Sequence, residues 1–319
     1  NRSIDYINQA PAGALLNNLV NGIGEANYFS LRPGDVNGFA AAVGAGPADV
    51  VAPDASQLDD DNITGKATID WQATEDLLVY ATWSRGFKAG GFNAGFLDQT
   101  DFITSDLVKF DNEVLTSYEG GFKWTAPNGL IRVNASGFYY DYEDFQALTF
   151  QGLSQFITNG DATFFGGEAE VGVRPIEGLD AQFGISLLDT DVDGVTVQGV
   201  TLNNREAVLA PNVTANGFIR YGLPVWAGEL AGTFSFNYQG EHFFDITNSD
   251  LSKEDGYVLF DMRIEYEPED SFWEIAFFGR NLTDKEYRVY TFDFTGPAGF
   301  NQQFFGPPRW WGGSVSVRF

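Results

Sequence analysis

Alternation of apolar and polar side chains dominates the chain from residue 62 onward. Ile69 and Trp71 fall on one face of an extended segment, while Thr68 and Asp70 fall on the other. The same period of two recurs in residues 131–136, 167–171, 213–217 and 258–266. Because successive side chains of a β-strand point to opposite faces, the pattern predicts strands with one apolar and one polar face. The sequence holds no run of about 18 apolar residues, the length that a membrane-spanning helix needs.

Two kinds of break separate the predicted strands. Short breaks, rich in the Pro, Asn, Gly and Asp that tight turns require, fall at residues 73–76, 126–129, 175–178, 223–225 and 268–271. Between them lie mostly longer breaks, at about 93–111, 190–205, 246–256 and 291–303, with a brief one near 151–154. Short periplasmic turns on one side and longer extracellular loops on the other are typical of a β-barrel in the bacterial outer membrane.

Tryptophan marks the side of the short turns. Within about four residues of such a turn lie Trp71, Trp124, Trp226 and Trp273. Indole favours the membrane–water interface, so these four are predicted to form an aromatic girdle there. A secreted β-sandwich or a lectin-like protein shares the aromatic, glycine-rich composition, but its tryptophans are expected mid-strand, in the core. The spacing therefore favours the barrel.

The chain is strongly acidic, with 44 Asp and Glu against 18 Lys and Arg in 319 residues. Phosphate binding needs a basic surface, so nucleic acid is excluded as a partner. The sequence contains no cysteine, which favours an envelope or extracellular protein. No basic segment followed by an apolar one opens the chain, so no signal peptide is visible, and we expect a fragment of a longer protein.

Counting gives about eleven strands after residue 61, which is an odd number. An antiparallel barrel closes with an even number, because unpaired backbone groups are costly in lipid. Either residues 1–61 hold a twelfth strand, as in an autotransporter translocator, or strands lie upstream, as in a plugged transporter of about 22 strands. Residues 1–61 lack sustained alternation and are predicted to be a long extracellular loop region with little regular structure. Residues 62–319 are predicted to be the C-terminal half of the barrel.

Several segments resemble those of TonB-dependent outer-membrane receptors of the iron-complex type. They are YATWSRGFKAGGFN at residues 80–93, EVLTSYEGGFK at 113–123, APN at 210–212, GRNLTDKEY at 279–287 and PR at 308–309. The final segment GGSVSVRF, residues 312–319, is similar to the terminal strand that outer-membrane assembly machinery recognises, with Val315, Val317 and Phe319 as the signal. The resemblance covers about residues 62–319.

The resemblance implies an all-β, transmembrane antiparallel barrel of about 22 strands, of which this chain holds about eleven. The plug domain and the TonB box of the family are not in this sequence. It implies active import across the Gram-negative outer membrane, driven by the TonB–ExbB–ExbD complex. The usual cargo is a ferric siderophore, sometimes cobalamin, haem or a glycan. Implied partners are outer-membrane lipid and lipopolysaccharide, the plug and the other barrel half of the same protein, and a small-molecule ligand.

Two alternatives remain open at the level of sequence, an autotransporter-type translocator barrel and a passive porin for small solutes or glycans. Enzymatic activity is not expected, because nothing in the spacing selects a serine or an acid to act with His242, the single histidine. No catalytic residue and no cofactor are predicted.

Two groups of residues are candidates for ligand binding. The first, where a strand leaves the membrane, comprises Arg85, Lys88, Phe92, Asn93 and Phe96. Cations flanked by aromatic rings can receive an anionic siderophore, although these cations can equally hold lipopolysaccharide phosphates or pair with lumen carboxylates. The second group, in the loop of residues 290–303, comprises Phe292, Phe294 and Phe300. These rings are predicted to form an aromatic ligand surface or a packed loop.

Charged residues suggest two further features. Asp189, Asp191 and Asp193 form a D-x-D-x-D-G pattern in a predicted extracellular loop, the arrangement that Ca²⁺ sites use. Val200 stands where such a site has its twelfth-position acid, and a solvated acidic loop is the alternative. On the polar faces, charge ladders across neighbouring strands are expected from Lys66, Glu119, Lys123, Arg132, Glu168, Glu170, Arg174, Arg220, Arg263 and Glu265.

Overall fold

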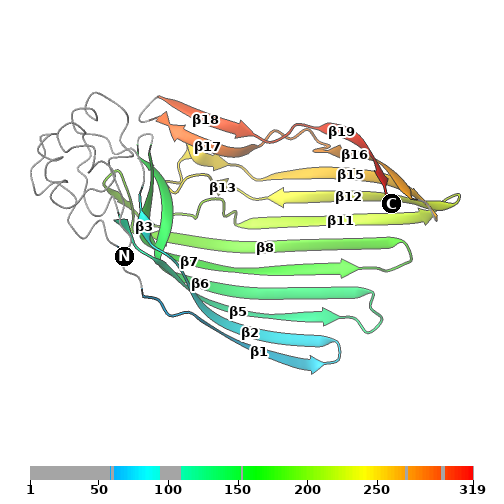
Figure 1. Ribbon diagram of the computed structural model, residues 1–319, viewed down its shortest axis with the longest axis horizontal. Helices are drawn as coiled ribbons and strands as arrows, with labels where there is room; N and C mark the ends of the chain where they lie inside the picture. Colours follow the sequence, from blue (N-terminus) through cyan, green and yellow to red (C-terminus); the bar gives the residue numbers. More distant parts are fainter. Residues whose placement is uncertain are drawn as a thin grey trace, which may run out of the picture.

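One antiparallel sheet of eleven strands forms most of the computed structural model, which describes Leu58 and residues 61–93, 109–151, 154–269, 272–295 and 299–318. From edge to edge the strands follow the order of the sequence (Figure 1). They are β1 (Gly65–Thr74), β2 (Leu77–Lys88), β5 (Glu113–Thr125), β6 (Ile131–Gln151), β7 (Ser154–Val173), β8 (Leu179–Asp193), β11 (Val213–Pro224), β12 (Gly228–Gln239), β15 (Tyr257–Pro268), β16 (Trp273–Arg280) and β19 (Trp310–Val317). The prediction of about eleven strands after residue 61 is confirmed for this main sheet.

Short turns join the strands at one end of the sheet, and mostly longer connections join them at the other, as predicted (Figure 1). Four of the longer connections contain a small sheet of two strands, which the sequence pattern did not reveal. These pairs are β3 (Gly91–Phe92) with β4 (Lys109–Phe110), β9 (Val195–Val197) with β10 (Val200–Leu202), β13 (His242–Phe243) with β14 (Lys253–Glu254), and β17 (Arg288–Phe294) with β18 (Phe300–Phe305). A 3₁₀ turn, η4 (Asp250–Ser252), precedes β14.

The register between strands keeps one face of the sheet apolar and the other polar. Trp71 of β1 stands opposite Val79 of β2, which in turn stands opposite Phe122 of β5. On the other face, Tyr80 of β2 donates a hydrogen bond of 2.7 Å to Glu119 of β5. Because side chains alternate strictly along a strand, a slip of one residue would exchange the two faces, so the apolar pattern fixes the register.

The apolar face of the sheet is open to its surroundings. Ile69, Ile219, Phe277 and Val315, from four different strands, are 73%, 55%, 49% and 67% exposed. Soluble proteins rarely expose a contiguous apolar patch larger than a few hundred Å². An apolar face that extends across eleven strands therefore indicates contact with the hydrocarbon of a bilayer, and we call this face outward and the polar face inward.

Buried apolar side chains gather at the loop end. One cluster comprises Ala147, Ala162, Val192, Val195, Ala207 and Ile246, which come from β6, β7, β8, β9 and the connections after β8 and β12. This cluster gives the longer connections a packed base on the sheet. None of the described residues forms a helix long and apolar enough to cross a membrane. The predicted loop region of residues 1–61 lies outside the described residues, apart from Leu58 and Asp61.

Candidate ligand-binding surface

The hairpin of β17 and β18 carries a row of aromatic rings on one face. Tyr290, Phe292 and Phe294 alternate along β17, while Phe304 and Phe300 stand opposite Tyr290 and Phe294 on β18. Ring centroids lie 4.7 Å apart for Tyr290 and Phe292, 5.6 Å for Phe292 and Phe294, and 5.5 Å for Phe294 and Phe300. Phe300 and Phe304 remain 50% and 41% exposed. The structure thus brings Phe292, Phe294 and Phe300 together and adds two rings; we call these five rings the aromatic row.

An ion pair fastens this hairpin to the neighbouring connection of residues 240–256. Nε of Arg288 lies 2.6 Å from Oε2 of Glu254, whose side chain is only 8% exposed. Arg288 also donates a hydrogen bond to the carbonyl oxygen of Lys253. From β18, Asn301 donates to the carbonyl oxygen of Leu251 at 3.3 Å. The aromatic row therefore rests on a defined support.

At one end, the aromatic row packs against buried rings of the neighbouring connection. The ring centroids of Tyr290 and Phe244 lie 5.8 Å apart, and those of His242 and Phe244 lie 5.1 Å apart in a T-shaped arrangement. His242 is buried, and its Nδ1 lies 3.0 Å from the carbonyl oxygen of Gly240. The imidazole is therefore a packed core group. Burial raises the pKa of Tyr290, and the carboxylate of Asp245 raises it further.

Asn281 organises the turn that follows β16. Its backbone is left-handed, with φ of 49°, a conformation that asparagine tolerates better than most residues. The side-chain amide donates to the carbonyl oxygens of Lys285 and Pro307, at 2.8 and 3.1 Å, and accepts from the backbone N–H of Lys285 at 2.8 Å. The neighbouring Asp284 accepts from the backbone N–H of Arg309 at 2.8 Å. The GRNLTDKEY segment thus joins both ends of the connection that carries the aromatic row.

We expect Asn281→Ala to lower stability by about 2–4 kcal/mol, because a buried side chain would lose three hydrogen bonds worth about 1 kcal/mol each. Alanine would also be strained at this φ. Thermal unfolding and limited proteolysis of residues 281–309 measure the effect. Thr283→Ala, at an exposed position of the same turn, is the matched control. Equal stability of the two variants would contradict the proposed role.

The first predicted group is not assembled as expected. Arg85 and Lys88 leave β2 on opposite faces, because their positions differ by an odd number. The Arg85 guanidinium donates to Thr116 at 2.9 Å and pairs with Glu143 at 3.3 Å, on the face that also carries Trp83. The two cations therefore do not converge on one ligand.

The side chain of Asn93 forms a structural contact with the backbone of β7. Its side chain is buried, donates to the carbonyl oxygen of Ile157 at 2.8 Å and accepts from the Ile157 N–H at 2.6 Å. This pair imitates one backbone pairing and attaches the connection to β7. Phe92 is half-buried in β3, and Phe96 lies outside the described residues.

The aspartate pattern is not a loop. Asp189, Asp191 and Asp193 occupy the last residues of β8, paired with β7. Alternate residues of a strand stand about 6–7 Å apart on one face, so these carboxylates form a row instead of converging. Asp193 accepts a hydrogen bond from the backbone N–H of Asn204 at 2.7 Å. Among the residues that the structure describes, no group of three or more His, Asp or Glu is arranged to hold a metal ion. The prediction of a loop at this position is wrong.

Near the aspartates that end β8, the pKa of one carboxyl group on β6 is raised by burial and by neighbouring negative charges. Asp144 has a left-handed backbone, with φ of 56°, at an irregularity in the pairing of β6 with β7. Burial raises the pKa of this carboxyl, and the negative charges of Asp111, Asp161 and Glu143 raise it further.

The four predicted girdle tryptophans lie at the short-turn end of the sheet. Trp71 and Trp226 are 64% and 90% exposed. The ring centroid of Tyr266, on β15, lies 5.7 Å from that of Trp226 and 6.3 Å from that of Trp273. Tyr266 therefore links the tryptophan of the β11–β12 turn to the tryptophan of β16. Trp124 occupies the end of β5. The four tryptophans thus lie at the end of the sheet where they were expected, and their interface role stays a prediction.

A second row of rings, which sequence reasoning missed, lies toward the loop end of the outward face. Trp83, Tyr118, Tyr139 and Phe165 are successive cross-strand partners on β2, β5, β6 and β7. They are 38–62% exposed. Only the register aligns them, because each lies mid-strand in the sequence. The two rows bound the apolar band on both sides, as in outer-membrane barrels.

The last strand closes the described sheet at its other edge. Val315 stands opposite Ile275, and Val317 stands opposite Trp273, with both valines on the outward face. Phe319 lies outside the described residues. The role of this segment as an assembly signal stays a prediction.

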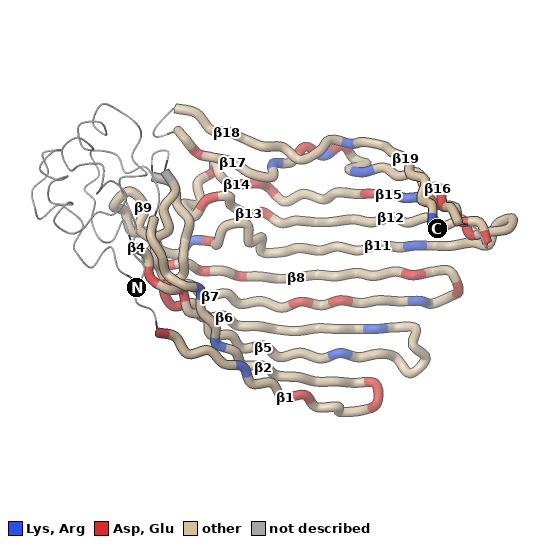
Figure 2. The backbone as a smooth tube through the Cα atoms, in the orientation of Figure 1, with Lys and Arg blue, Asp and Glu red and all other residues tan. Residues whose placement is uncertain are grey.

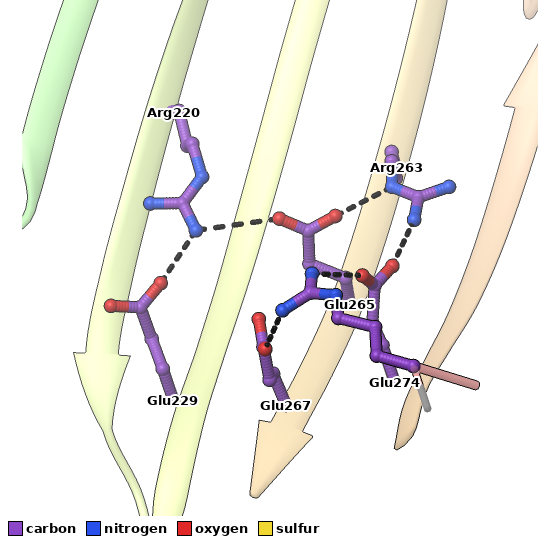
Figure 3. A network of polar contacts seen from close by, with 7 residues as sticks. Arg220, Glu229, Arg263, Glu265, Glu267 and Glu274 are labelled. Atoms are coloured by element: carbon purple, nitrogen blue, oxygen red, sulfur yellow. Dashed lines mark hydrogen bonds and ion pairs between the residues drawn. The ribbon is translucent and has the colours of Figure 1, made fainter. Parts of the chain in front are cut away.

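An ionic network covers the inward face near the short turns (Figure 3). Arg220 of β11 contacts Glu229 of β12 at 2.5 Å and Glu265 of β15 at 3.3 Å. Arg263 contacts Glu265 at 2.6 Å and Glu274 of β16 at 2.5 Å. The network thus spans four neighbouring strands.

Arg318 extends the network past the end of β19. It contacts Glu267 at 2.7 Å and Glu274 at 3.7 Å. The predicted ladder is confirmed for Arg220, Arg263 and Glu265. Elsewhere on this face Glu119 accepts from Tyr80, and Arg174 pairs with Asp180 at 3.2 Å. Within the described part of the chain, no ion pair joins Lys66, Lys123, Arg132 or Glu170 to another residue.

An antiparallel sheet with an apolar outward face, a charged inward face, short turns at one end and built-up loops at the other is a wall of a membrane-spanning β-barrel. Residues 26–282 match the family model described as TonB dependent receptor-like, beta-barrel. The chain therefore belongs to the TonB-dependent receptor family, whose members are outer-membrane receptors and not enzymes.

The relatives agree with this assignment. The chain is 24% identical over 248 residues to the pesticin receptor of Yersinia pestis, a match that covers 74% of this chain and 33% of that protein. Among solved structures, the ferric yersiniabactin uptake receptor FyuA of Yersinia pestis superposes with a TM-score of 0.67 at 20% identity, covering 82% of this chain and 38% of that one. The siderophore receptor PiuA of Acinetobacter baumannii gives 0.59 at 18% identity, covering 79% and 35%. The chain thus spans about a third of the length of the curated relatives it matches.

Proposed function

We propose that this chain forms part of the wall and loops of a receptor that imports a scarce metal chelate across the outer membrane, with energy supplied through TonB. The family match carries this proposal. Relatives named as a ferric yersiniabactin uptake receptor, a siderophore receptor and a copper transporter support a metal-containing cargo. The aromatic row, held at the loop end by buried contacts, supplies a surface on which a small organic chelate can bind.

The partners follow from the two edges of the sheet. Among the described residues, β1 and β19 each have one edge without a strand partner. Unpaired backbone groups in hydrocarbon cost several kcal/mol each, so we propose that strands of the same protein complete the wall on both sides. The charged inward face then meets a plug domain of that protein, and the outward face meets lipid and lipopolysaccharide.

The proposal is tested by measuring uptake of a chelate into cells in which the intact receptor is the only receptor for that chelate. Under iron limitation, we expect a radiolabelled ferric or cupric chelate to accumulate in cells that have TonB. Cells without TonB should bind the chelate at the surface without accumulating it. Uptake that is independent of TonB, together with steady conductance of the purified protein in planar bilayers, would contradict the proposal and favour a passive porin.

A further inference from the structure

The connection that supports the aromatic row is strongly acidic. Residues 240–256 carry one basic side chain, Lys253, against Glu241, Asp245, Asp250, Glu254 and Asp255. Acidic positions, red in Figure 2, recur at the loop end beside β13, β14 and β17. Residues 289–305 of the aromatic hairpin contain no Lys or Arg and one acid, Asp293. The rings therefore lie in a field of negative charge.

The basic side chains nearest to the row are already neutralised. Nζ of Lys253 lies 2.7 Å from Oε2 of Glu241, and Arg288 pairs with the buried Glu254. Farther along the loop end, Arg85, Lys109 and Arg309 pair with Glu143, Asp111 and Asp284. Within the described loop end, the basic residues without such an ion pair are Lys66, Lys88, Arg205 and Lys285, and none of them is on β13, β14, β17 or β18.

Several acids beside the row have no such partner. Asp250 and Asp255 are exposed, and neither forms an ion pair with another described residue. Asp245 accepts one hydrogen bond, from the backbone N–H of Thr247 at 2.8 Å, and lies close enough to Tyr290 to act on its hydroxyl. Asp293 accepts from the backbone N–H of Thr295 at 2.9 Å. Lys253, which already pairs with Glu241, also lies near enough to Asp250 and Asp255 to feel their charges. Residues 240–256 and 288–305 therefore set six acids against two cations, Lys253 and Arg288.

Rings and carboxylates favour the same kind of ligand. The face of an aromatic ring carries negative potential and attracts a cation, as a nearby carboxylate does. A ligand with several negative charges would be repelled by both and would find no unpaired guanidinium on the hairpin. We infer that the chelate bound at the aromatic row carries a net positive charge, as an ammonium or guanidinium group on an apolar body. This inference rests on the proposed function and names its class of substrate.

Binding of three related ferric complexes to the intact receptor in nanodiscs tests the charge. The probes are the ferric complex of a linear trihydroxamate with a free terminal amine, its N-acetyl derivative and its N-succinyl derivative, with net charges of about +1, 0 and −1 near pH 7. We expect the cationic complex to bind about tenfold more tightly than the acetylated one, and the succinylated one to bind weakest. Raising the salt concentration should reduce these differences.

Two variants connect the preference to named residues. Asp245→Asn combined with Asp250→Asn and Asp255→Asn should remove most of the preference for the cation, whereas Glu177→Gln, in a short turn at the far end of the sheet, should leave it unchanged. Phe304→Leu keeps an apolar side chain without a ring. It should weaken the cationic complex more than the acetylated one, a difference that loss of packing alone would not produce.

Equal or tighter binding of the acetylated or succinylated complex would overturn the inference, and so would the absence of saturable binding by the cationic complex. Parallel uptake assays with the three complexes and ferric citrate separate this outcome from failure of the proposed function. TonB-dependent uptake of ferric citrate in preference to the cation overturns the charge inference and leaves import intact. Absence of TonB-dependent uptake for every chelate overturns both.

Discussion

Phe183→Arg is expected to destabilise the folded receptor by about 2–4 kcal/mol, the cost of a cation on the lipid-facing side of a barrel strand near mid-membrane. Phe183 is on the outward face of β8, 44% exposed, between Val171 of β7 and Gly217 of β11. The arginine would exchange water for hydrocarbon when the strand inserts. Urea titration of the receptor in lipid vesicles, followed by loss of heat-modifiable migration, measures the change.

The adjacent residue supplies the control. Gln182 is exposed on the inward face at the same depth, so Gln182→Arg should change stability by less than about 0.5 kcal/mol. Phe183→Leu separates loss of the ring, which lies 6.2 Å from Phe236, from introduction of the charge. If Gln182→Arg were as damaging as Phe183→Arg, the assignment of the two faces would be incorrect.

Glu254→Ala is expected to weaken the attachment of the β17–β18 hairpin by about 3 kcal/mol, because it leaves the positive charge of the half-buried Arg288 without its carboxylate. The structural consequence should be local. The β17–β18 hairpin would lose its ion pair with β14. Its backbone should therefore become accessible to protease, while the melting transition of the eleven-stranded sheet stays unchanged. Limited proteolysis with mass spectrometry of residues 281–309 detects the released hairpin.

Two variants define the specificity of this effect. Glu254→Gln keeps an acceptor oxygen for Arg288 Nε and should retain part of the protection. Glu286→Ala, an exposed position of the same connection, should behave as the wild type. Protection of the hairpin in Glu254→Ala would mean that the ring contacts, such as Tyr290 with Phe244, hold the hairpin without the ion pair.

The strands were predictable because the bilayer imposes a simple rule on them. A strand with lipid on one side and a polar interior on the other must alternate, and residues such as Ile69 and Asp70 show this in the bare sequence. The short turns were equally visible, because Pro, Gly and Asn are required where the chain reverses within a few residues.

The loop end was harder to predict because its contacts join distant parts of the sequence. Asn93 pairs with the backbone of Ile157, and Arg288 pairs with Glu254; neither pairing has a local signature. Alternation also misled at Asp189, Asp191 and Asp193. The acidic spacing suggested a cation-binding loop, while the same spacing is what one face of a strand produces.

Each of the four longer connections contains a two-stranded sheet of its own, separate from the strands of the wall. The wall keeps its register whatever the loops contain, so a loop can be exchanged without refolding the strands beneath it. The connection that carries β13–β14 is bound to two others. Glu254 and Phe244 join it to Arg288 and Tyr290 of the β17–β18 hairpin, and Asn248 accepts a hydrogen bond from the backbone N–H of Glu206, in the connection after β8, at 2.7 Å. These three connections must therefore be inherited together, and a graft that moves the rings to another receptor needs to carry the acidic connection with them.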